Sequence, residues 1–134
     1  MIPNPPAQNL TIMVIDDSNT IRRSAEIFLT QGGYRVVLAE DGFDALAKIH
    51  DYHPALVLCD LMMPRLDGYQ TCALIKKNPQ FHAIPVLLLS SRDGLFERAR
   101  ASMVGAAAYL TKPFTQDSLL AAVREHTGGA QGAQ

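Results

Sequence analysis

Apolar stretches about as long as a β-strand recur five times along the chain. Most residues in each stretch are apolar, without the alternation expected of a strand that has one wet face. Near-continuous apolar strands are typical of a parallel sheet that is covered on both faces. The five predicted strands are residues 10–15, 34–39, 55–59, 84–89 and 106–110.

Helical patterns occupy the segments between and after these strands. Apolar residues recur there at spacings of three and four, which places them on one side of a helix. Five strands that alternate with five helices through short connections require right-handed parallel crossovers, so the sequence predicts a doubly wound α/β fold. The five helical faces are Ile21, Ala25, Phe28 and Leu29; Ala45, Leu46 and Ile49; Tyr69, Cys72, Ala73 and Lys76; Phe96, Ala99 and Met103; Leu119, Leu120 and Val123.

Turn and capping residues set the limits of these helices. Gly32 or Gly33 should end the first helix, because glycine is common in C-terminal caps. The second helix should end before Pro54, the third at Asn78-Pro79, and Thr115 should cap the start of the fifth.

Length and composition favour one globular domain without a nucleic-acid or membrane surface. The 134 residues include 48% hydrophobic and 19% charged residues, and 12 Lys and Arg balance 13 Asp and Glu. No basic stripe suggests nucleic acid, and no signal peptide or run of about 18 apolar residues suggests membrane insertion, so a cytoplasmic location is expected. We expect a domain at residues 10–126 between flexible tails at 1–9 and 127–134, which are rich in Pro, Gly and Gln.

The cysteines and histidines do not suggest a metal centre. Cys59 lies in an apolar run and Cys72 in a helical pattern, so both are expected to be buried free thiols. The histidines are scattered, without the paired spacing of a zinc site. They are His50, His53, His82 and His126.

Polar side chains follow the predicted strands at the carboxyl edge of the sheet, where open parallel sheets bind ligands. Taken singly, each has an ordinary explanation: Asp17 or Ser18 as a helix cap, Asp60 as a turn residue, Lys112 as a solvated charge. Their convergence at one edge instead favours a site. The first strand supplies Asp16 and Asp17, the third Asp60, the fourth Ser90 and the fifth Lys112.

The chemistry of this set favours a divalent metal and a phosphoryl group. Three adjacent carboxylates repel one another, and Mg²⁺ is the hard, oxygen-binding ion that would hold them together. Lys112 would then face a transferred phosphoryl group, to which Ser90 could donate a hydrogen bond. Asp60, between the acidic pair and Lys112, is the best-placed phosphate acceptor.

These residues resemble the receiver domain of bacterial two-component response regulators over about residues 10–126. The resemblance rests on "VIDDS", "LVLCDLMMPRLDGYQ", "IPVLLLSS" and "YLTKPF", in that order and spacing. It implies a five-stranded sheet of flavodoxin-like order 2-1-3-4-5 and phosphorylation by a histidine kinase. The implied roles are magnesium binding by Asp16, Asp17, Asp60 and the Met62 backbone carbonyl, phosphorylation of Asp60, contacts of Ser90 and Lys112 with the phosphoryl group, and Tyr109 as an aromatic switch.

The resemblance also carries finer expectations. Ser90 stands where threonine is commoner in the family, and the Lys112-Pro113 bond should be cis. A downstream target protein should bind the face formed by the fourth helix, fifth strand and fifth helix. "DGFDALAKI" and "SSRDGLFERAR" look most like single-domain receivers of the type IV pilus twitching-motility system.

Other classes of protein fit the sequence less well. A haloacid-dehalogenase-type phosphatase needs its second carboxylate two residues after the first, where Ser18 stands. A flavodoxin-like FMN carrier would suffer repulsion between its phosphate and Asp16 and Asp17. A receiver-like module that interacts without phosphorylation remains open, as does an ordinary core role for Tyr109 and Phe96.

Overall fold

The computed structural model describes residues 10–92 and 94–127, which form five strands in alternation with five helices. The predicted tails lie outside the described residues except for Thr127, which ends the last helix. The strands are β1 (Thr11–Ile15), β2 (Arg35–Ala39), β3 (Leu56–Asp60), β4 (Val86–Ser90) and β5 (Ala108–Thr111). The helices are α1 (Asn19–Gln31), α2 (Gly42–Tyr52), α3 (Gly68–Lys77), α4 (Leu95–Met103) and α5 (Gln116–Thr127).

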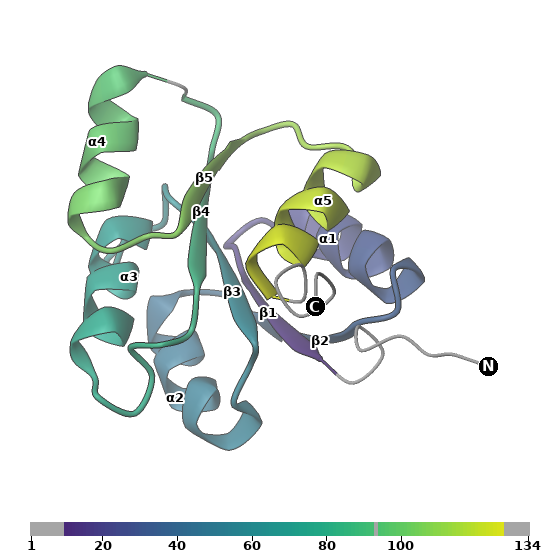
Figure 1. Ribbon diagram of the computed structural model, residues 1–134, viewed down its shortest axis with the longest axis horizontal. Helices are drawn as coiled ribbons and strands as arrows, with labels where there is room; N and C mark the ends of the chain where they lie inside the picture. The colour runs from purple at the N-terminus through teal and green to yellow at the C-terminus, as the bar shows by residue number, and fades with distance from the viewer. Residues whose placement is uncertain (1–9, 93, 128–134) are drawn as a thin grey trace.

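All five strands form one parallel sheet in the order β2-β1-β3-β4-β5. The sheet lies between two layers of helices, with α1 and α5 on one face and α2, α3 and α4 on the other (Figure 1). This arrangement confirms the predicted doubly wound α/β class and the predicted strand order.

Two hydrophobic cores, one on each face of the sheet, explain the unbroken apolar runs. Met13 and Ile15 of β1 pack in the core beneath α2 and α3, while Ile12 and Val14 pack in the core beneath α1 and α5. Every residue of β3 and β4 is buried. A strand that is covered on both sides needs apolar residues at every position, so period-two alternation is absent.

The helix limits follow the predicted capping residues closely. Gly32 caps the end of α1, and Gly33 has φ of 95°, a left-handed conformation that glycine adopts without strain. Asn78 caps the end of α3. At the start of α5 the Thr115 hydroxyl accepts a hydrogen bond from the Ser118 backbone N–H at 3.0 Å, which confirms the predicted cap.

The exposure of α4 decides an alternative that the sequence left open. Phe96, Ala99 and Met103 share one side of the helix, as predicted, and all three are exposed, whereas Ala101 is buried. Periodicity shows that apolar residues share one side of a helix, but it does not show that this side faces the protein. The structure therefore excludes an ordinary core role for Phe96.

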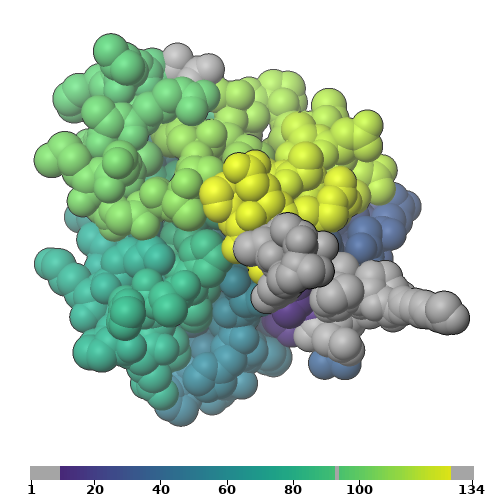
Figure 2. All heavy atoms as spheres, in the orientation of Figure 1, coloured from purple at the N-terminus to yellow at the C-terminus, as the bar shows by residue number. Residues whose placement is uncertain are grey.

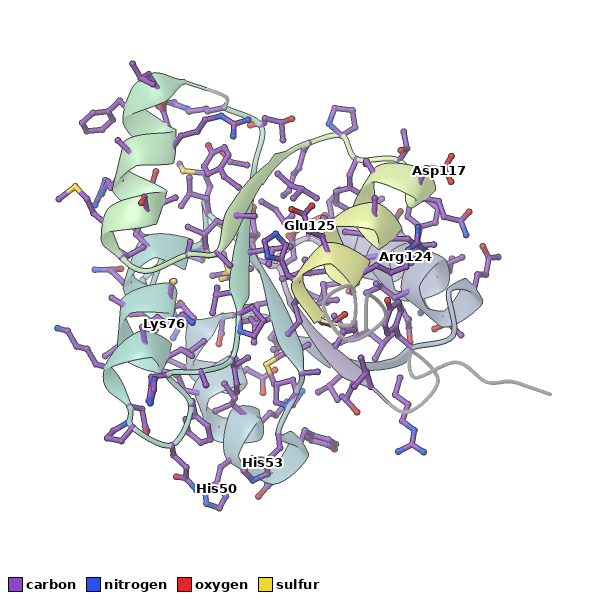
Figure 3. The ribbon with its side chains drawn as sticks, in the orientation of Figure 1. His50, His53, Lys76, Asp117, Arg124 and Glu125 are labelled. Atoms are coloured by element: carbon purple, nitrogen blue, oxygen red, sulfur yellow. The ribbon has the colours of Figure 1, made fainter. Side chains whose placement is uncertain are left out.

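Cys59 directly precedes Asp60 in β3, and Cys72 lies in α3. Cys59 and Cys72 are buried free thiols, as expected, and burial raises the pKa of each. His50 and His53 lie side by side at the end of α2 (Figure 3), with ring centroids 6.0 Å apart. None of the helices in the described part of the chain has the length and apolar character that a membrane crossing requires.

Candidate functional site

The fold brings the predicted polar residues together along one edge of the sheet. Asp16 directly follows β1 and continues its pairing with β2, because its backbone N–H donates to the Ala39 carbonyl at 3.1 Å. Asp60 and Ser90 are the last residues of the neighbouring strands β3 and β4, and Lys112 follows β5. The site thus lies where four adjacent parallel strands end, as the strand order requires.

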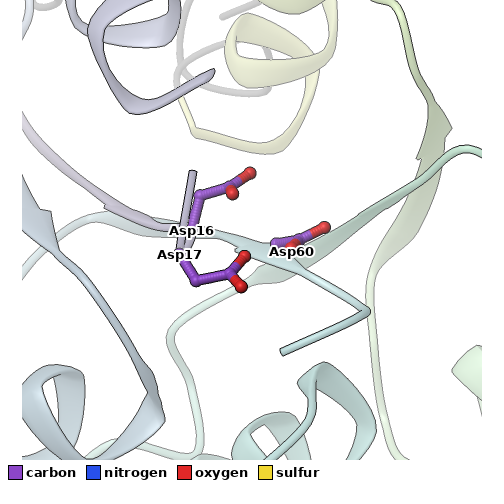
Figure 4. Close-up of side chains that lie close together, drawn as sticks. All are labelled: Asp16, Asp17 and Asp60. Atoms are coloured by element: carbon purple, nitrogen blue, oxygen red, sulfur yellow. The ribbon is translucent and has the colours of Figure 1, made fainter. Parts of the chain in front are cut away.

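Three carboxylates meet at the centre of this edge. Ligand atoms of Asp16, Asp17 and Asp60 lie within 4.8 Å of one another, and their side chains converge in Figure 4. Asp16 is 0% exposed and Asp60 4% exposed, whereas Asp17 faces solvent. A donor set made only of oxygens, with one side open to water, suits Mg²⁺, which keeps several waters when proteins bind it. The residues present therefore fit the expected ion.

Lys112 extends its ammonium group into the same cluster. Its Nζ lies 2.8 Å from Asp60 Oδ1 and 3.1 Å from Asp16 Oδ2. Burial would lower the pKa of Lys112, but the hydrogen bond to Asp60 and the charge of Asp16 outweigh that effect, and the pKa lies above its usual value. The lysine is therefore a fixed positive charge directly beside the candidate acceptor.

The Asp60 carboxyl is harder to ionise than a solvent-exposed aspartate. Burial raises the pKa of Asp60 from 3.8 to about 6, the hydrogen bond from Lys112 works in the opposite direction, and the charge of Asp16 raises it further. Desolvation of the carboxylate thus raises the pKa of Asp60 by more than the hydrogen bond from Lys112 lowers it. At neutral pH Asp60 is still mostly ionised and able to act as a nucleophile.

Ser90 and Tyr109 are linked through the backbone of a single residue, Arg92. The Ser90 hydroxyl, 1% exposed, accepts a hydrogen bond from the Arg92 N–H at 3.0 Å, which leaves its own hydrogen available to donate. The Tyr109 hydroxyl donates to the Arg92 carbonyl, and its ring is buried. The Tyr109 ring is thus packed inward in this structure. This link could not be recognised from the sequence, because Arg92 contributes only its backbone N–H and carbonyl to it.

Several residues that support the site were not recognised from the sequence. A Cβ on Gly68 would lie 2.6 Å from the Asp60 carbonyl oxygen, so only glycine lets α3 begin this close to β3. The Arg22 guanidinium donates to the Asp16 carbonyl. Of the two caps considered from the sequence, Ser18 rather than Asp17 caps α1. Gly68 was visible as the glycine of "LDG", but the bond from Arg22 to a backbone carbonyl leaves no sequence pattern.

The loop after β3 is held from outside by Arg65. Its guanidinium lies 2.9 Å from Asp41 Oδ2 and stacks on the Phe43 ring, 5.3 Å from the centroid. This clip joins the start of α2 to the loop that contains Met62. The Met62 side chain is 62% exposed, and the role of its carbonyl as a metal ligand remains a prediction.

The Lys112-Pro113 bond is cis, as predicted.

Comparison with known proteins identifies the family. Residues 12–124 match the model of the response regulator receiver domain. The chain belongs to this receiver family. Receivers are signalling domains rather than enzymes that turn over a separate substrate. The carboxyl-edge site therefore belongs to a signalling protein.

Individual relatives agree with this assignment. The receiver is 58% identical to Protein PilG of Pseudomonas aeruginosa over 120 residues, which are 90% of this chain and 89% of PilG. It is 41% identical to the response regulator MprA of Mycobacterium sp. strain KMS over 84% of this chain, and spans 48% of that longer protein. The solved structure of chemotaxis protein CheY4 of Vibrio cholerae superposes with a TM-score of 0.84 at 28% identity, covering 87% of this chain and 98% of CheY4.

Proposed function

We propose that this receiver accepts a phosphoryl group on Asp60 from a phosphohistidine of a histidine kinase, in the cytoplasm. In the transfer the phosphorus–nitrogen bond breaks as a phosphorus–oxygen bond to Asp60 forms, and the histidine nitrogen takes up a proton from solvent. The observation that carries the proposal is the cluster itself: three carboxylates within 4.8 Å, with Lys112 bonded to Asp60. The membership of this chain in the receiver family supports the same chemistry.

The residues around Asp60 have separate tasks in this proposal. Asp16, Asp17, Asp60 and the Met62 carbonyl would hold Mg²⁺, which would neutralise charge on the phosphoryl oxygens. Lys112 would keep its place beside Asp60 and bind a phosphoryl oxygen, exchanging its bond to the carboxylate for one to the new group. The Ser90 hydroxyl hydrogen, which its bond with Arg92 leaves available, would be donated to another oxygen.

We further propose that the output is carried from Ser90 to Tyr109 through the Arg92 backbone. If the Ser90 side chain moves toward a phosphoryl group, the bond that it accepts from the Arg92 N–H would move with it, and the Arg92 carbonyl that accepts from Tyr109 belongs to the same residue. The inward position of the tyrosine ring would then be favoured, altering the face of α4, β5 and α5 that a target protein reads. The similarity to PilG supports a target in type IV pilus control.

Phosphotransfer from purified histidine kinases tests the first proposal. Labelled phosphate should move from the kinase to the wild-type receiver only with Mg²⁺ present, and Asp60→Asn should accept none. Asp117→Asn, an exposed aspartate of α5, is the matched control and should be labelled like wild type. Transfer that is equally fast to Asp60→Asn would show that another residue is the acceptor. Absence of transfer to the wild-type receiver would favour the phosphorylation-independent interaction module.

Tyr109→Phe and Tyr109→Ala separate the switch from the core role of the ring. Phenylalanine keeps the buried ring and removes the bond to the Arg92 carbonyl, whereas alanine removes both. Target affinity is measured with and without a phosphoryl mimic, and a typical coupling of about 1 to 3 kcal/mol corresponds to roughly 5- to 150-fold. The affinity ratio should shrink in both variants, and an unchanged ratio would show that Tyr109 carries no signal.

A further inference from the structure

The exposed side of α4 carries an apolar stripe, defined here as Leu95, Phe96, Ala99 and Met103. Leu95 is 87%, Phe96 73% and Met103 85% exposed. Residues spaced by three and four lie on the same side of a helix, so the stripe is continuous along α4. The helix lies at an outer edge of the molecule (Figures 1 and 2). Side chains of this size at these exposures are typical of an interaction surface.

One flank of the stripe borders a cavity of about 200 Å³ between α4 and the start of α3. Its apolar walls are Leu61, Met62 and Phe96, and Tyr69 of α3 also lines it. This volume equals that of about seven liquid waters, which is enough for one large apolar side chain. We call the stripe and this cavity together the α3–α4 groove.

Among the described residues that line the cavity, positive charges outnumber negative ones. These residues are Arg92 and Arg100 on one side of the balance and the carboxylate Glu97 on the other. The Glu97 carboxylate folds back toward Gly94, since a Cβ placed there would lie 2.2 Å from Glu97 Oε1. Arg100 stacks on the Tyr69 ring at 4.2 Å from its centroid. Across residues 10–92 and 94–127, neither guanidinium forms an ion pair with a carboxylate.

We propose that the α3–α4 groove binds an acidic amphipathic helix of a partner protein. One large apolar side chain of that helix fills the cavity beside Phe96, and further apolar residues at i+3 or i+4 cover the stripe. Carboxylates that flank the anchor pair with Arg92 and Arg100, which form no ion pair with a carboxylate of the described residues. Complementary charge then selects this partner and orients it on the helix.

This groove is distinct from the face next to Tyr109. The other flank of α4 borders a second cavity, lined by Arg98, Ala101 and Tyr109 among others, and Phe96 does not contribute to it. The α3–α4 groove instead includes Leu61 and Met62, the two residues that follow Asp60. The docking itself requires no phosphoryl group, so it can be tested on the protein whether or not the proposed phosphotransfer is correct.

A synthetic helical peptide provides the probe: Glu-rich, with Phe and Leu spaced four residues apart, titrated into the ¹⁵N-labelled full chain. A second peptide has every Glu replaced by Lys. We expect amide shifts at α4 and at the start of α3 with the acidic peptide only. Phe96→Ala should weaken its binding by about 10-fold or more, as is typical for a central anchor, and Arg100→Gln should weaken it less.

Ile27→Ala is the matched control, because Ile27 is an exposed apolar residue of α1, on the opposite face of the sheet. It should leave the affinity unchanged, and thermal unfolding should show that all variants are folded. Equal affinity for the two peptides would overturn the charge-selective partner. Shifts confined to β5 and α5, or full affinity in Phe96→Ala, would overturn the groove.

Discussion

The carboxyl-edge site buries charged side chains, whereas α4 exposes large apolar ones. Each departs from the usual distribution of polarity in proteins, in which charged residues are exposed and apolar ones buried. At the edge of the sheet, Asp16 is completely buried and Asp60 nearly so, whereas on α4 Leu95 and Met103 are almost fully exposed. Buried charge and exposed apolar surface both lower stability, and both indicate function. The difference lies in cause: strand topology forces the carboxylates together, but nothing in the fold requires the apolar side of α4 to face outward.

The largest expected difference between α4 and the rest of the chain concerns packing. Leu88→Ala in β4 removes a fully buried side chain and should lower the free energy of unfolding by about 2 to 5 kcal/mol. Leu95→Ala on the stripe should change it by less than about 0.5 kcal/mol. Urea unfolding monitored by circular dichroism measures both. A loss for Leu95→Ala that approaches that of Leu88→Ala would show that the stripe is part of the core.

The next effect concerns how the buried Asp60 carboxylate changes the free energy of unfolding. The pKa of Asp60 is about 6 in the folded protein against 3.8 for the free side chain, so the folded state binds the proton more tightly. Stability from this group is therefore fully present below about pH 4 and is lost as pH rises to about 6. Above that, the ionised carboxylate costs on the order of 3 kcal/mol.

Asp60→Asn should consequently be more stable than wild type at pH 7.5 without magnesium, by up to about 3 kcal/mol. The gain should shrink toward zero near pH 3.5. Asp117→Asn on the exposed start of α5 should give no gain at either pH. Denaturant unfolding at the two pH values measures this, and a destabilised Asp60→Asn at pH 7.5 would show that the bond to Lys112 outweighs the desolvation.

The smallest effect tests whether an exposed residue contributes to the site. Arg65→Ala breaks the clip to Asp41 and Phe43 and should loosen the loop that contains Met62. An exposed ion pair contributes about 1 kcal/mol or less, so magnesium affinity should fall by roughly 2- to 5-fold in isothermal titration. Arg23→Ala removes the exposed pair with Glu26 on α1 and should have no effect. Equal affinities in the two variants would show that the clip does not position the loop.

Strand ends could be predicted from the sequence, but the orientation of α4 could not. Apolar runs locate all five strands, and the residues that end them identify Asp16, Asp60, Ser90 and Lys112, because topology alone brings strand ends together. The burial of Ala101 instead of Phe96 was not predictable, since periodicity defines a side of a helix without its direction. The Arg92 link and the Arg65 clip depend on backbone atoms and on side-chain conformations that only the folded chain determines.

Chemical phosphorylation with a small acyl phosphate, followed by intact mass and fragment mapping, tests directly whether Asp60 is the phosphoacceptor. We expect a gain of one phosphoryl group, located on Asp60, that requires Mg²⁺ and disappears in Asp60→Asn and Asp17→Asn. Labelling in Asp117→Asn should equal that of wild type. A wild-type protein that gains no phosphoryl group with Mg²⁺ present, or gains it at another residue, would contradict the assignment of the carboxyl-edge cluster as a phosphoacceptor site.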